Sequence, residues 1–188
     1  MDKIKKKASY TFCVNLFLAV TLLVFGPMEI FIYNSSDFQF TFSDFWYILA
    51  LFALGYIIIA TFFLSLLPEK LCEMFAMFLF AFTVCCYLQA MFLNGKMQVM
   101  VGYEIAWGTS TKLFNLAIWL CIFGLIFAAR HYLKENYRKT VQFLSLALTA
   151  VQLVALIFLL FTTDVLTEKK NGYISDEKML ELSAGGAT

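Results

Sequence analysis

Long apolar runs alternate with short polar interruptions along this chain. Each run continues for about 17 to 25 residues, the length at which a helix crosses a bilayer. The runs cover roughly residues 8–26, 45–67, 71–93, 112–129 and 140–162. A segment in hydrocarbon must be helical, because lipid offers no partners to free backbone groups. The pattern therefore predicts an all-α, polytopic membrane protein, a bundle of about five transmembrane helices.

Residues that stop or start helices mark the borders of the runs. Gly26-Pro27 ends the first run and Pro68 the second, because proline cannot continue the ladder of amide hydrogen bonds. Asn94-Gly95 ends the third run. Ser43 and Asp44 precede the second run and can cap its free amides. The lysine-rich N-terminus is not followed by a small-residue cleavage site, so we expect the first run to be a retained helix rather than a signal peptide.

Basic residues near the ends of the runs are unevenly distributed. One side of the predicted bundle receives four lysines at the N-terminus, Lys70, and four residues between the fourth and fifth runs, Arg130, Lys134, Arg138 and Lys139. The opposite side receives only Lys96 and Lys112. Lysine and arginine accumulate in cytoplasmic loops of membrane proteins. The asymmetry predicts a cytoplasmic N-terminus and an extracytoplasmic C-terminus.

The composition supports the membrane class and narrows the chemistry. The chain of 188 residues is 62% hydrophobic and 14% charged, which leaves too little polar surface for a soluble domain. Its net charge of +1 says nothing about nucleic acid, because the basic residues cluster at the ends of the runs, and we expect no nucleic-acid partner. The single histidine, His131, argues against a histidine-based metal site. All five cysteines lie in apolar runs, where we expect them to pack between helices rather than form disulfides.

The polar groups on the predicted outer side are the candidate binding residues. Glu29, Asn94, Glu104 and Trp107 fall in the segments 27–44 and 94–111, at the depth of a lipid headgroup. A carboxylate and an amide there could orient a headgroup ammonium or a sugar hydroxyl; the alternative is an ordinary hydrated loop. Aromatic residues enrich the same segments, and they form either an interfacial belt or a surface for a lipid tail or partner domain.

Few residues inside the runs carry charge. Glu73 lies in the first turn of the third run, where the helix dipole favours an anion, and we interpret it as structural. Asn15, Gln89, Asn115, Gln142 and Gln152 are expected to hydrogen-bond between helices. A transporter would show interrupted helices and an internal repeat, and the sequence indicates neither. We expect no catalytic residue, no metal ligand and no cofactor in this chain.

Three stretches of the chain resemble one known family. They are residues 27–30, residues 87–95 continuing to 104–107, and residues 160–164 leading to 173–175 and 181–183. With the five-run layout, they resemble the N-terminal membrane region of bacterial sulfatase-like transferases of the alkaline-phosphatase superfamily. That family includes lipoteichoic acid synthases and lipid A phosphoethanolamine transferases. The resemblance covers nearly the whole chain.

The resemblance implies a function that the chain would perform with a further domain. Residues 1–163 would be a five-helix transmembrane domain in the bacterial cytoplasmic membrane, and residues 164–188 a linker toward a metal-dependent catalytic domain absent from this chain. The chain would anchor that transferase or hydrolase and hold its lipid substrate, so its expected partners are the bilayer and a phospholipid headgroup. A stand-alone scaffold or partner subunit is the alternative, and a transporter comes last. Donor, acceptor and oligomeric state stay open.

Overall fold

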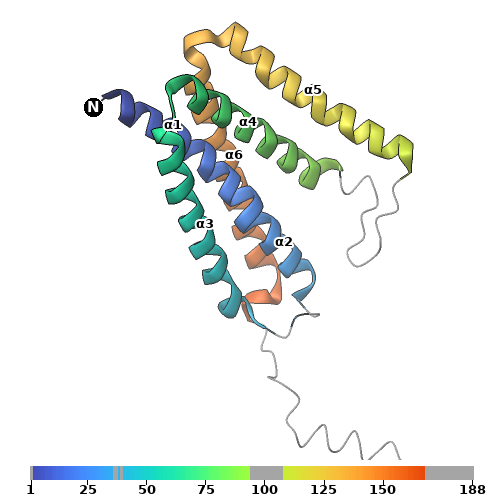
Figure 1. Cartoon of the computed structure of the whole chain (residues 1–188). Helices are drawn as coiled ribbons and strands as arrows, with labels where there is room; N and C mark the ends of the chain where they lie inside the picture. Colours follow the sequence, from blue (N-terminus) through green and yellow to red (C-terminus); the bar gives the residue numbers. More distant parts are fainter. Residues whose placement is uncertain (1, 36–37, 39, 94–107, 168–188) are drawn as a thin grey trace, which may run out of the picture.

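The structure is a computed structural model that describes residues 2–35, 38, 40–93 and 108–167 (Figure 1). Within these residues it contains helices and no strand. Five of the helical segments are long and apolar enough to cross a membrane, which confirms the predicted all-α class. Their outward faces carry large apolar side chains such as Leu125, Phe158 and Phe161, as surfaces in contact with lipid do.

The helical segments follow the predicted runs. In chain order they are α1 (Asp2–Ala19), the π-helix η1 (Val20–Phe25), α2 (Gly26–Tyr33), α3 (Phe42–Leu66), α4 (Glu69–Leu88), the π-helix η3 (Gln89–Leu93), α5 (Thr109–Leu133), the short η4 (Lys134–Asn136), α6 (Tyr137–Thr162) and η5 (Asp164–Leu166).

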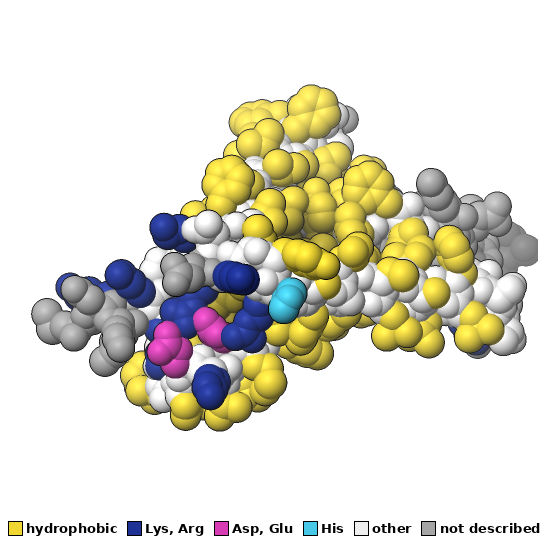
Figure 2. Space-filling model, turned by 90° about the horizontal axis from the view of Figure 1, so that it is seen from above, with side chains coloured by type: hydrophobic (Ala, Val, Ile, Leu, Met, Phe, Trp, Pro, Cys, Tyr) yellow, Lys and Arg dark blue, Asp and Glu magenta, His cyan; other side chains and the backbone are white. Residues whose placement is uncertain are grey.

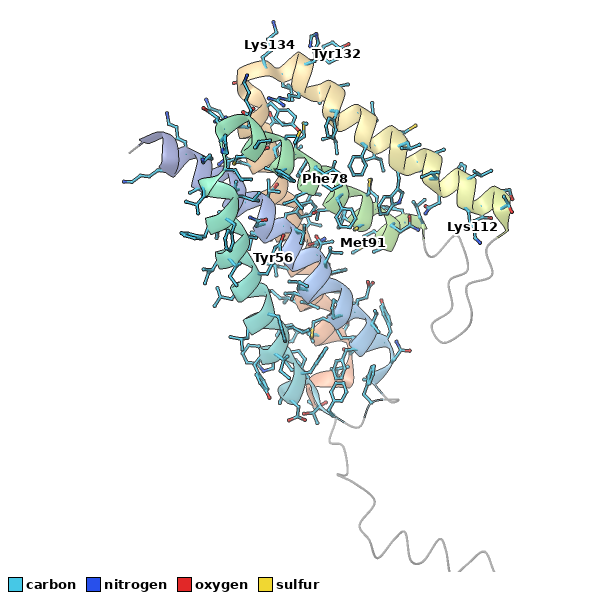
Figure 3. The ribbon with its side chains drawn as sticks, viewed as in Figure 1. Tyr56, Phe78, Met91, Lys112, Tyr132 and Lys134 are labelled. Atoms are coloured by element: carbon cyan, nitrogen blue, oxygen red, sulfur yellow. The ribbon has the colours of Figure 1, made fainter. Side chains whose placement is uncertain are left out.

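The first span lies at the centre of the bundle. Helix α1 packs against α3, α4 and α6, while α5 lies outermost and contacts mainly α4 (Figure 1). The start of α1, the α3–α4 turn and the α5–α6 turn meet at one end of the bundle. We call this the basic end, because most of the described lysine and arginine side chains gather there (Figure 2). Lys112 lies at the other end of α5 from Lys134 (Figure 3).

The basic half of the core is built from three helices. Tyr10, Val14 and Phe17 follow one another at helical spacing on α1 and are almost fully buried. They pack against α4, through residues that include Ala76 and Phe80, and against the start of α6. Three alanines among the described residues, Ala19, Ala76 and Ala81, are fully buried, and side chains of this size allow helices to approach closely.

The prediction that Gly26-Pro27 ends the first span is wrong. The helix continues to Tyr33, so the span covers Lys5–Tyr33. In a regular α-helix the Pro27 ring would clash with the carbonyl of Leu23. Instead the preceding turn is π-helical, and the Gly26 N–H donates to the carbonyl oxygen of Thr21, five residues back. The wide turn carries the chain past the proline without ending the helix.

The start of the second span also differs from the prediction. Helix α3 begins at Phe42, and its N-cap is Thr41 rather than Ser43 or Asp44. Asp44 reaches back from the first turn, where its carboxylate accepts hydrogen bonds from the Thr41 backbone N–H at 3.0 Å and the Thr41 hydroxyl at 2.7 Å. This is the reciprocal half of a capping box, so Asp44 stabilises the turn from within the helix.

Candidate functional site

Glu29 is the one predicted binding residue that the structure describes. It lies on α2, one turn before the end of the first span, and not in a loop as the sequence predicted. Its side chain is half-buried. Within the described part of the chain, Glu29 makes no hydrogen bond or ion pair. A partly buried carboxylate without a partner is costly, so this position favours a ligand that supplies one.

The other three predicted binding residues, Asn94, Glu104 and Trp107, lie outside the described residues. Their placement relative to Glu29 therefore stays a prediction. So does most of the predicted linker, since the description ends at residue 167.

The aromatic residues near Glu29 divide into two groups. Phe31, Phe38, Phe40 and Phe45 pack on one another, with ring centroids 5.0 to 5.5 Å apart. This packing stabilises the junction of α2 and α3. The exposed aromatic residues are Tyr33, Trp46, Tyr47 and one member of the first group, Phe40, and these are available to a membrane interface.

Glu73 is the centre of a charged cluster at the basic end. Its two carboxylate oxygens accept hydrogen bonds from Arg130 Nη2 and Arg138 Nε, each at 2.6 Å, and Arg138 Nη2 also pairs with Glu69 at 2.7 Å. The cluster joins α4, α5 and α6 close to the lysines of α1 (Figure 2). A carboxylate held by two arginines serves to fix helices together, as the structural interpretation of Glu73 expected.

Most of the predicted polar contacts between helices are present. Gln89 accepts a hydrogen bond from Trp119 Nε1 at 3.0 Å, and Gln142 Nε2 donates to Ser9 Oγ at 3.2 Å. Asn15 Nδ2 donates to Thr61 Oγ1 at 3.2 Å. Tyr56 lies on α3 and donates from its hydroxyl to Asn15 Oδ1 at 3.3 Å (Figure 3).

The exception is Asn115. Its buried Oδ1 atom has no hydrogen-bond partner in the part of the chain that the structure describes. The prediction is therefore wrong for this acceptor, because α5 packs too loosely against its neighbours to bring a donor to it. No residue of α5 is buried.

Two hollows flank the π-helix η1. An apolar groove of about 580 Å³ lies between the first span and α3, with Gly55 and Tyr56 in its wall. A cavity of about 250 Å³ lies on the other side, against α4, η3 and α6. Leu22 and Pro27 line both hollows.

The smaller hollow contains a polar pair. Thr21 and Gln152 line it, and Gln152 Nε2 donates to Thr21 Oγ1 at 3.0 Å. The second π-helix, η3, supplies Ala90 and Met91 to the same wall (Figure 3). We call this hollow the mid-span cavity. The sequence analysis did not predict the π-helical turn beside this cavity, although Gly26-Pro27 near the end of an apolar run was a signal for an irregular helix.

All five cysteines are free thiols. Cys13, Cys72 and Cys85 are buried, Cys86 is partly exposed at the mid-span cavity, and Cys121 is exposed on α5. The prediction that they pack inside the bundle therefore holds for the first three and is wrong for Cys121.

In comparisons with family models, curated proteins and solved structures, no match to this chain was found. The resemblance to sulfatase-like transferases therefore stays a prediction from the sequence. Among the described residues, the structure shows five membrane-length apolar helices, a Glu29 without a partner, and a mostly apolar cavity with one polar pair between irregular helices.

Proposed function

We propose that this chain is a membrane anchor that holds lipid substrate for an extracytoplasmic sulfatase-like transferase or hydrolase, whose catalytic residues lie in another domain. In this proposal the basic end is cytoplasmic, following the positive-inside rule, and Glu29 lies at the outer surface of a bacterial cytoplasmic membrane. The sequence resemblance supplies the class of enzyme. The membrane-length helices supply the anchor.

The observation that carries the proposal is the state of Glu29. Asp44, a second carboxylate at the same end, is hydrogen-bonded to Thr41, and Glu73 at the basic end is paired with two arginines. Glu29 is half-buried and has no such partner among the described residues. An ammonium or a sugar hydroxyl on a lipid headgroup would satisfy it. Holding the reacting headgroup still lowers the barrier to transfer, by about 7–11 kcal/mol in the best-oriented cases.

Binding by the chain itself can be measured without the catalytic domain. We expect native mass spectrometry to detect a phospholipid with an ethanolamine headgroup, and Glu29→Ala to weaken its binding about tenfold to a hundredfold, the effect of losing one charged hydrogen bond. Asp44→Ala is the matched control, because its carboxylate already has a partner. Binding of a lipid with a sugar headgroup, which has hydroxyl groups but no ammonium, shows which of the two groups Glu29 recognises. Equal binding by both variants and the wild type would contradict the role of Glu29.

The downstream reading frame tests the enzyme class. We expect it to encode a hydrophobic strand that ends in a metal-binding aspartate, followed by a threonine or serine nucleophile. In that full-length protein, Glu29→Ala, Asn94→Ala and Glu104→Ala should lower transfer from lipid and spare hydrolysis of a soluble phosphoester. A stop codon directly after Thr188 would instead favour the stand-alone scaffold.

Orientation has its own test. Cysteines introduced at Ser36 and Gly108 should react with an impermeant thiol reagent in intact cells, and one at Asn136 in the α5–α6 turn should not. The test uses a variant in which the five native cysteines are replaced. Labelling at Asn136 but not at Ser36 would reverse the proposed orientation.

The structure also bears on the transporter alternative. The sequence indicated no interrupted helix, yet two π-helices, η1 and η3, face each other across the mid-span cavity. Both spans nevertheless continue without a break, from Lys5 to Tyr33 and from Glu69 to Leu93, and η3 forms the last turn of the latter, so they are not the broken helices expected of a transporter. Among the described residues, no carboxylate or base lines the cavity, so they do not offer the usual carrier of a coupled ion. The anchor proposal is therefore kept first.

A further inference from the structure

The hydrogen bonds around Gln152 leave part of its amide without a partner. Thr21 Oγ1 lies 2.7 Å from the Phe17 carbonyl oxygen, 3.1 Å from Gln152 Oε1 and 3.0 Å from Gln152 Nε2. A hydroxyl has a single hydrogen to donate. When that hydrogen goes to the nearest acceptor, the Phe17 carbonyl, Thr21 can still accept from Nε2 but has nothing to donate to Oε1.

The unused capacity is therefore one acceptor and one donor. An amide offers two N–H groups and one carbonyl oxygen, and in the described residues Thr21 is the only partner of Gln152. Gln152 lines the mid-span cavity but is fully buried, at 0% exposure, so a hydroxyl in the cavity reaches its amide only when the side chain turns toward the cavity. A buried polar atom without a hydrogen bond costs about 1–3 kcal/mol, so the site favours an occupant that supplies the missing bonds.

The cavity extends from the middle of the bundle toward the end opposite the basic end. Gln152 is ten residues from Thr162, the last residue of α6, which is about 15 Å along a helix. A hydrocarbon core is about 30 Å thick, so this amide is near its middle. Glu29 is eight residues beyond Thr21 on the first span, about 12 Å further toward that end, and Ile30 directly after it still lines the cavity.

The lining selects the chemical class of the occupant. Most of the wall is apolar, from residues such as Leu22, Phe25 and Met91, and none of the described residues that line it is charged. At about 30 Å³ each, roughly eight water molecules would fill 250 Å³, far more than one amide and one hydroxyl can hydrogen-bond. An apolar molecule alone would leave Gln152 unsatisfied.

We propose that the mid-span cavity binds a neutral, membrane-soluble molecule with an apolar body and one hydroxyl group. The hydroxyl donates to Gln152 Oε1 and accepts from the free Nε2 hydrogen, while the apolar body lies between η1 and η3. Such a molecule enters from the bilayer, because Ile30, in the cavity wall, is 53% exposed on the lipid-facing surface. The site does not depend on Glu29 or on the proposed function.

The test uses two photoreactive probes on the full chain in lipid nanodiscs. One is an octanol with a diazirine group, and the other is the matching octane without the hydroxyl. In the wild type we expect the octanol probe to label peptides of η1, η3 and the middle of α6, competed by unlabelled octanol. Gln152→Met should lower this labelling about threefold to tenfold, the value of one or two hydrogen bonds. The octane probe should label both proteins equally.

Three further variants keep the result interpretable. Gln142→Met removes an amide from the same helix outside the cavity, where it bonds to Ser9, and should not change labelling. Ala90→Leu adds bulk inside the cavity and should reduce labelling by both probes. Thr21→Val frees the Gln152 amide and should maintain or increase octanol labelling, which decides the matter if Gln152→Met does not fold.

Three outcomes would overturn the proposal. The first is octanol labelling spread over the lipid-facing surfaces of α3 and α5 with no enrichment at the cavity. The second is equal octanol labelling of the wild type and a folded Gln152→Met. The third is loss of octanol labelling in Thr21→Val, because that variant leaves the amide in place.

Discussion

The two ends of this bundle each carry a glutamate on a membrane-spanning helix, and the two residues are in opposite situations. Glu73 at the basic end is bound by Arg130 and Arg138, which come from two other helices. Glu29, near the opposite end, has no partner among the described residues although its side chain is half-buried. The carboxylates are chemically alike, so the difference comes from what the neighbouring helices bring to each.

The contrast separates a structural charge from one available to a ligand. At the basic end, Arg130 and Arg138 pair with the acidic residues of α4, so charge there holds helices together. Near Glu29 the neighbouring helices supply aromatic and aliphatic side chains instead. A carboxylate in such surroundings is stabilised by a ligand that supplies a hydrogen-bond donor or a positive charge.

Removing Glu73 should have the largest effect on stability. Glu73→Ala leaves the exposed Arg130 without its partner and Arg138 with Glu69 alone, and we expect a loss of about 1.5 kcal/mol in the free energy of unfolding, between the values for exposed and buried pairs. The midpoint of unfolding in denaturing detergent measures it. A change below about 0.5 kcal/mol would mean that the cluster contributes no more than exposed ion pairs do.

Lys7 should have the next largest effect. Its Nζ donates at 2.6 Å to the carbonyl oxygen of Leu67, the C-cap of α3, and so stabilises a helix end with a positive charge. Lys7→Met should cost about 1 kcal/mol. The exposed neighbour Lys6 provides the control, and Lys6→Met should change stability by less than about 0.5 kcal/mol. Equal effects would show that only the net charge of the segment matters.

Glu29 should behave in the opposite way to Glu73. Glu29→Gln removes a half-buried charge that no described residue pairs, so the free energy of unfolding should rise, by about 0.5 kcal/mol. The same detergent unfolding assay measures it, and lipid should be removed first, because a bound headgroup would stabilise the wild type. A loss of stability comparable to that of Glu73→Ala would show that Glu29 has a structural partner.

Asp44 should have the smallest effect, limited to one helix turn. Asp44→Ala removes both hydrogen bonds to Thr41, so the amides of the first turn of α3 should exchange with deuterium faster while the rest of the helix is unchanged. Ser43→Ala should have no effect, since Thr41 is the N-cap. Faster exchange in the Ser43→Ala variant would instead support Ser43 as a cap of this helix, as the sequence predicted.

The sequence alone determined the class and the spans of this protein. Runs of about 20 apolar residues can be accommodated only as helices in lipid, so their number and approximate position follow from hydropathy without knowledge of packing. The same holds for the excess of basic residues at one end. Local signals were less reliable: Pro27 was expected to end a helix, yet a π-helical turn carries the helix past it.

Only the tertiary structure decided which polar residues are paired and which are available. Glu29 and Glu73 have similar sequence surroundings, and the arginines that occupy Glu73 lie 57 and 65 residues away along the chain. The pairing of Gln152 with Thr21 spans 131 residues, and it leaves part of the amide free only because one hydroxyl is shared among three atoms. Hydrogen bonds between helices depend on their rotation and separation, which are set by packing of the whole bundle.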